Sequence, residues 1–177
     1  TQQYVKNVLL LQAQEDNDPI AEYHASEETV ARKLREMLIA VQMEKTYSKL
    51  EILQGYLNIA QFGRGIYGVE MAARRYFSTT ADKLDIVQAA TIAAITKNPA
   101  AFDPSVESNQ KASQRERNIV LDLMYQEEYI SQKQRDEAKA KPLKDTLKLQ
   151  DAQAGCSASG DAAFFCDYVT KKILNSK

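Results

Sequence analysis

Residues 30–58 constrain the fold of this chain more than any other stretch of its sequence. Apolar residues recur there at helical spacing, in one run of Val30, Leu34, Met37, Leu38 and Val41 and a second run of Leu50, Leu53 and Leu57. Between the runs, Ser48 and Glu51 have the spacing of a capping box, in which the serine caps the amide three residues on and the glutamate reaches back. The stretch predicts two helices with a sharp break between them.

The rest of the chain also favours helices. Six glycines and four prolines in 177 residues suit an all-helical fold rather than a turn-rich β fold. Helices are predicted over residues 2–13, 69–77, 85–95, 108–126 and 131–140. Ser26 is predicted to cap the helix that follows it. The only histidine, His24, is assigned to a polar loop, where neither a metal-binding nor a triad role is expected.

Composition narrows the functional classes. An apolar fraction of 44% and a charged fraction of 27% are those of an ordinary globular protein with one core. The net charge of −1 carries no polyanion-binding signature, so no nucleic-acid partner is expected. No run approaches the roughly 18 apolar residues that span a bilayer. Since Thr1 leads straight into a helical pattern without a signal peptide, we expect a fragment whose natural beginning is missing.

Arg32 and Glu36 lie on the side of the first predicted helix opposite its apolar face. At about 100° per residue they are roughly 40° apart. One interpretation is a solvent-exposed ion pair, worth about 0.2–0.5 kcal/mol. However, Ile39 and Met43 continue along the same side, and a helix that is apolar all round is usually buried. The pair is then part of a cleft wall, and spacing alone leaves both interpretations open.

Gly63, Gly65 and Gly68 mark a backbone that turns tightly or lets a ligand approach closely. Their spacing, G-x-G-x-x-G, is also that of a dinucleotide-binding loop. No β-strand is predicted before it and no βαβ unit surrounds it, so a dinucleotide site is not expected.

The segment 143–177 differs in character and contains both cysteines, Cys156 and Cys166. Nine residues separate them, among them Gly, Ser and Ala, and no second ligand cluster supports a zinc site. They fit a disulfide in an oxidising compartment, and two unrelated buried thiols are the alternative.

Four motifs follow one another in residues 1–118. They are TQQYVKN at residues 1–7; Arg32-Lys33-x-x-Glu36 with SKLEIL and YLN at residues 32–58; the three glycines with AARRYF at residues 63–77; and AAITKNP with FDP at residues 93–104. In this order they resemble the second to fifth motifs of the peptidoglycan glycosyltransferases (family 51) of bifunctional class A penicillin-binding proteins. The tail AAFFCDYV is similar to the segment that leads to the transpeptidase domain in some actinobacterial members.

The sequence departs from the family pattern at several places. The first motif, a Glu-Asp pair with an aromatic residue and a histidine, is expected upstream of Thr1 and is absent here. Tyr4 replaces a usual leucine, Thr96 a usual proline and Ser78 a usual glycine. The segment 12–25 is longer than the family's norm. None of these substitutions affects a charged motif residue.

The resemblance implies a mainly α, lysozyme-like glycosyltransferase fold that is incomplete at its N-terminus. Residues 1–142 would form the glycosyltransferase domain, and residues 143–177 a linker toward a transpeptidase domain. It implies a membrane-anchored enzyme on the extracytoplasmic face, with the anchor in the missing N-terminal part and with cell-wall synthesis proteins as partners. An exported location favours a Cys156–Cys166 disulfide.

The implied reaction is polymerisation of lipid II on a nascent glycan strand, with undecaprenyl pyrophosphate as the leaving group. The general base is expected in the absent first motif, so this chain alone is expected to be inactive. Arg32 and Lys6 match residues that hold the phosphates, and Gln3 matches a neighbouring donor. Glu36 matches an essential catalytic glutamate, which would orient the cations or hold a divalent metal, Mg²⁺ or Mn²⁺. Lys33, Gly63 and Gly65 would shape the donor side.

Two other functions are considered. A lysozyme-like glycan-cleaving enzyme needs a carboxylic acid that protonates a glycosidic oxygen, and the nearness of Arg32 to Glu36 argues against it because a cation favours the charged carboxylate. A non-catalytic helical binding module would keep the sequence pattern without the activity.

Overall fold

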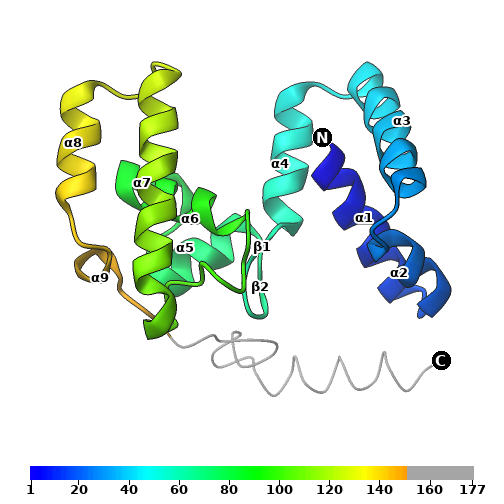
Figure 1. Ribbon diagram of the computed structural model, residues 1–177, viewed down its shortest axis with the longest axis horizontal. Helices are drawn as coiled ribbons and strands as arrows, with labels where there is room; N and C mark the ends of the chain where they lie inside the picture. Colours follow the sequence, from blue (N-terminus) through cyan, green and yellow to red (C-terminus); the bar gives the residue numbers. More distant parts are fainter. Residues whose placement is uncertain (151–177) are drawn as a thin grey trace.

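The computed structural model describes residues 1–150, and within them the chain is mainly α, as expected (Figure 1). The elements are α1 (Gln2–Glu15), α2 (Pro19–Ser26), α3 (Val30–Thr46), α4 (Lys49–Ile59), β1 (Gln61–Gly63), β2 (Ile66–Tyr67), α5 (Val69–Phe77), α6 (Ile86–Ile95), α7 (Gln110–Gln126), α8 (Gln132–Ala140) and α9 (Leu143–Thr146), with short 3₁₀ turns at Ala81–Lys83 and Glu107–Asn109. No helix of residues 1–150 has both the length and the apolar character that crossing a bilayer requires.

The helices form two groups on either side of the β1–β2 hairpin (Figure 1). Helices α1 to α4 make up the first group, in which α1 contacts α2, α3 and α4. In the second group, α6 packs against α7, and two apolar clusters form the core. One lies under the hairpin and α5 and includes Phe62, Phe77 and Ile95, and the other joins α6, α7 and α8 through Ala90, Leu121 and Ala138.

The expected polar loop before α3 is wrong, because residues 19–26 form helix α2. Asp18 caps it, with one carboxylate oxygen accepting the amides of Ile20 and Ala21 at 3.0 Å each. Pro19 occupies the first helical position, where its missing N–H costs nothing. The predicted cap of α3 is also wrong, since Thr29 rather than Ser26 accepts the amide of Arg32.

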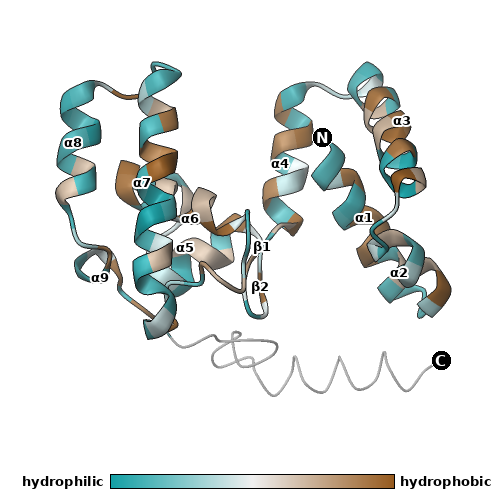
Figure 2. Ribbon diagram, in the orientation of Figure 1, coloured by the Kyte–Doolittle hydropathy of each residue, from teal (hydrophilic) through white to brown (hydrophobic). Residues whose placement is uncertain are grey.

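The apolar face predicted for α3 exists, but it is exposed to solvent. Its members Val30, Leu34, Met37, Leu38 and Val41 are all exposed, and Figure 2 shows apolar positions along the ribbon of α3. The buried residues of the helix are Arg32, Glu36 and Ala40. The position of α1 decides this orientation, because α1 packs against α3 and the ion pair compensates the burial of charge.

The β1–β2 hairpin is locked to the second group of helices at Gly63. This residue has a φ of +152°, and a Cβ there would overlap the Tyr76 hydroxyl and the Asp103 carboxylate. The Tyr76 hydroxyl donates to the carbonyl of Phe62 at 2.7 Å. Burial and the nearby Asp103 carboxylate raise the pKa of Tyr76, so the hydroxyl stays a neutral donor.

Residues 143–150 fold back onto the domain. Leu143 is buried, and the amides of Lys148 and Gln150 donate to the carbonyls of Tyr76 and Arg75. The first eight residues of the predicted linker therefore pack against α5 and α7. The predicted Cys156–Cys166 disulfide lies outside the described residues.

Candidate functional site

Helix α3 carries a buried carboxylate that is held by one buried and one exposed cation. The Glu36 side chain is 1% exposed, and one of its oxygens accepts from the Nη1 of Arg32, whose side chain is 7% exposed. The other oxygen accepts from the Nζ of Lys33 at 2.9 Å. Arg32 and Glu36 are one turn apart, so their side chains meet on the same face. Of the two interpretations of their spacing, the structure confirms the cleft wall and contradicts the surface ion pair.

The connection between α2 and α3 fixes the Arg32 guanidinium from a second side. Its Nε donates to the carbonyl of Glu27, the residue that ends α2 and whose own amide bonds to the carbonyl of Tyr23 at 2.8 Å. With Nε on Glu27 and Nη1 on Glu36, the planar group has one orientation. Among the described contacts, the Nη2 group and the second N–H of Nη1 are the donors of Arg32 that are left for a ligand.

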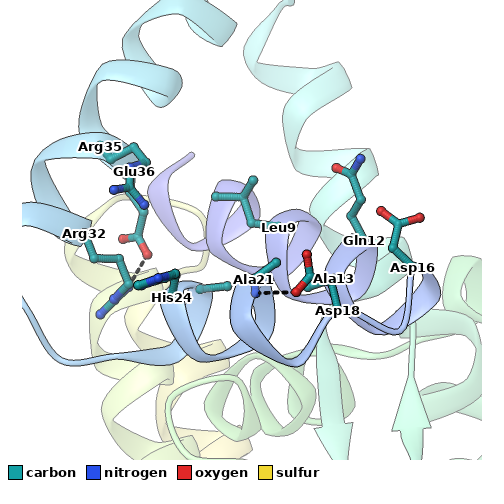
Figure 3. A pocket seen from close by; sticks show the side chains of 11 residues that line it. Leu9, Gln12, Ala13, Asp16, Asp18, Ala21, His24, Arg32, Arg35 and Glu36 are labelled. Atoms are coloured by element: carbon teal, nitrogen blue, oxygen red, sulfur yellow. Dashed lines mark hydrogen bonds and ion pairs between the residues drawn. The ribbon is translucent and has the colours of Figure 1, made fainter.

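A cavity of about 310 Å³ adjoins this cluster, between α1, α2 and α3 (Figure 3). Its lining residues are Leu9, Gln12, Ala13, Asp16, Asp18, Ala21, His24, Ala25, Arg32, Arg35 and Glu36. The lining is small and apolar in the middle, and charged groups lie at both ends. The size suits a small anionic group rather than a whole lipid-linked sugar.

Lys33 and the other predicted site residues do not line this cavity. Lys6 lies on α1 one turn before Leu9 and does not line the cavity. Gln3 turns away, and its Nε2 donates to the carbonyl of Thr96 at 3.5 Å. Gly63 and Gly65 belong to the hairpin. The structure thus brings together Arg32, Lys33 and Glu36, and the roles of Gln3, Lys6, Gly63 and Gly65 stay predictions.

Sequence reasoning missed three members of the site. These are His24 on α2, Arg35 on α3 and the carbonyl of Glu27. A signal for α2 was present, because Asp18 followed by Pro19 is a typical helix start. The contact between Arg32 and the carbonyl of Glu27 leaves no pattern in the sequence, since every residue has a backbone carbonyl.

The metal role expected for Glu36 stays a prediction. Each of its carboxylate oxygens accepts from one cation, and in residues 1–150 no three His, Cys, Asp or Glu side chains converge as a metal site built from protein side chains alone would require. The contacts themselves suit the other expected role of Glu36, orientation of the cations.

Comparison with known proteins agrees with this chemistry. The family model described as Transglycosylase matches residues 1–125. The chain is 36% identical over 174 residues to penicillin-binding protein 1A/1B of Bacillus subtilis, covering 98% of this chain and 17% of that protein. It is 39% identical over 175 residues to penicillin-binding protein 1A of Aquifex aeolicus, covering 99% and 21%. The chain therefore spans about a fifth of the length of these relatives.

A solved structure is also similar. The crystal structure of penicillin-binding protein 1A from Haemophilus influenzae matches with a TM-score of 0.53 and 31% sequence identity, over 73% of this chain and 17% of that chain. Sequence and structure thus point to the same family.

Proposed function

Since this chain belongs to the transglycosylase family, we propose that it is the part of a peptidoglycan glycosyltransferase that holds the leaving group while lipid II is polymerised into glycan strands. The observation that carries this proposal is the buried Glu36, whose two oxygens hold Arg32 and Lys33. A buried carboxylate with two cations is costly to assemble for stability alone. It suits a site that must present fixed positive charge.

The chemistry requires such a charge. As the acceptor hydroxyl attacks C1 of the growing chain, the bond to the pyrophosphate breaks and negative charge develops on the departing phosphate oxygens. Arg32 would bind a phosphate through the free edge of its guanidinium, with Lys33 beside it. Lys6, one turn before Leu9 on α1, would supply a third cation. Glu36 stays behind the cations, where it orients them and is shielded from the phosphates.

The remaining parts of the proposal concern cofactor, partners and place. The cations that Glu36 holds on α3 would supply positive charge to the leaving group, and a divalent metal, Mg²⁺ or Mn²⁺, on the pyrophosphate stays part of the proposal. Lipid II and the nascent glycan strand are the substrates, and other cell-wall synthesis proteins are partners. We place the reaction at the extracytoplasmic face of the cell membrane, since its donor is lipid-linked and the relatives are penicillin-binding proteins.

A glycan-cleaving enzyme of the lysozyme type is the main rival. It needs a protonated carboxyl, but Glu36 has no oxygen free of a cation. The test incubates the longest protein that carries this chain with lipid II and, separately, with finished glycan. We expect glycan polymer from lipid II and no cleavage of the finished strands. Cleavage of finished glycan without polymer formation would show a hydrolase, and neither activity would favour a binding module.

A further inference from the structure

Helix α2 forms one wall of the cavity, although none of its residues belongs to the four family motifs. It contributes Ala21, His24 and Ala25 to the lining, facing Leu9 and Ala13 of α1. Figure 3 shows His24 reaching from α2 toward the end of the cavity that contains Arg32. Helix α2 therefore adds side chains to this site that the four motifs do not contain.

The charges around the cavity are divided between its two ends. Arg32 and Arg35 come from α3, where the carboxylate of Glu36 also lines the cavity but is paired with Arg32. Asp16 and Asp18 lie at the turn between α1 and α2. Asp18 is engaged in capping α2, which fixes a negative charge at that end. An anion is repelled from the carboxylate end and attracted to the arginine end. Within residues 1–150, the only titratable side chain that α2 places in the cavity lining is His24.

We propose that α2 is a positioning element of the leaving-group site and that His24 is a further hydrogen-bond donor to the phosphate bound by Arg32. This inference rests on the proposed function. One contact and one position support it: the carbonyl of Glu27, directly after α2, fixes the guanidinium of Arg32, and the last turn of α2 carries His24. One short helix therefore sets the position of both groups.

The immediate surroundings of His24 suit this role. Its side chain is 54% exposed, so a ligand in the cavity can reach it, and its Nδ1 lies 3.5 Å from a carboxylate oxygen of Glu27. With Nδ1 toward Glu27, Nε2 is the ring nitrogen that would donate to a phosphate in the cavity.

The test is calorimetric titration of inorganic pyrophosphate into the 177-residue chain in the presence of EDTA. The variants are His24→Ala, His24→Gln and Arg32→Ala, with Ile20→Ala as the control, because Ile20 lies on the same helix, is 69% exposed and does not line the cavity. We expect His24→Ala to weaken binding about 3- to 10-fold, which is the value of one hydrogen bond. His24→Gln keeps a donor and recovers part of the loss, and Ile20→Ala binds like the wild type.

The outcomes separate the two proposals. If Arg32→Ala abolishes binding while His24→Ala binds like the wild type, the role of His24 is contradicted and the proposed function stands. If the wild type does not bind pyrophosphate, or Arg32→Ala binds equally well, both are contradicted. Thermal unfolding of each variant provides the second measurement. A loss of binding in His24→Ala that His24→Gln does not recover, together with a lowered melting temperature, would show that His24 is only structural.

Discussion

Glu36 is the residue on which the proposed chemistry depends, because its carboxylate holds both Arg32 and Lys33. Its spacing from Arg32 was compatible with a weak surface pair or with a cleft wall, and the residues themselves could not decide between them. The structure shows a cleft wall, because α1 packs against α3 and the carbonyl of Glu27 accepts a hydrogen bond from the Nε of Arg32. A charged pair that is exposed is worth little, whereas a buried one with complete hydrogen bonding has a fixed geometry.

Gly63 offers a stability test at the scale of one residue. Gly63→Ala should lower the free energy of unfolding by about 3 kcal/mol, because the new methyl group meets Tyr76 and Asp103 and the φ of +152° is unfavourable for alanine. Gly65→Ala is the matched control, since Gly65 also has a positive φ but open space around it, and about 1 kcal/mol is expected. Urea unfolding measures both, and equal losses would contradict the packing argument.

At the scale of elements, the contact between α1 and α4 depends on a glycine inside a helix. A Cβ at Gly55 would overlap the ring of Tyr4, which stands where the family usually has leucine. Gly55→Ala should therefore destabilise the chain by about 1 kcal/mol, although alanine is the better helix former.

The double variant Tyr4→Leu/Gly55→Ala should return to within about 0.5 kcal/mol of the wild type, because the smaller side chain makes room for the methyl group. Unfolding of the two single variants and the double variant gives this coupling. A stabilising effect of Gly55→Ala alone would show that the Tyr4 ring is free to move.

The capping box of α4 predicts a dependence on pH. Bonds from the Ser48 hydroxyl and backbone lower the pKa of Glu51. A carboxyl with a lowered pKa in the folded state stabilises above its unfolded pKa of about 4.3, and this contribution is lost as pH falls through the folded value. The difference in melting temperature between wild type and Glu51→Gln should therefore shrink from pH 7 to pH 3. Glu127→Gln, an exposed change outside the box, should show no such trend, and a constant difference for Glu51→Gln would refute the linkage.

The elements themselves were largely predictable, and their orientation was not. Caps and periodicity are local, so the helix over residues 2–13 and the break at Ser48 were found. Helix α2 was missed because its short polar sequence has weak periodicity, despite the Asp18-Pro19 start. The exposed apolar face of α3 could not be foreseen, since periodicity identifies a face but not what packs against it.

For the whole molecule, the unpredicted part of the site consists of contacts between distant residues. The motifs predicted Arg32, Lys33 and Glu36 as site residues, and in the structure Glu36 accepts hydrogen bonds from both cations. The cavity depends on α1 and α2 packing against α3, and the hairpin depends on Asp103, which accepts the amide of Arg64 from 39 positions away. Such contacts follow from the assembled fold and leave no local pattern in the sequence.

The most direct test of the central claim is the rate of lipid II polymerisation by the longest protein that carries this chain, compared between wild type and Glu36→Gln. Without the carboxylate charge, the neutral amide of this variant cannot hold both cations toward the leaving pyrophosphate, so we expect the rate to fall at least about 100-fold while cooperative unfolding is retained. Glu137→Gln, in an exposed i, i+4 pair with Lys133, should leave the rate unchanged. Wild-type turnover by a folded Glu36→Gln variant would contradict the account.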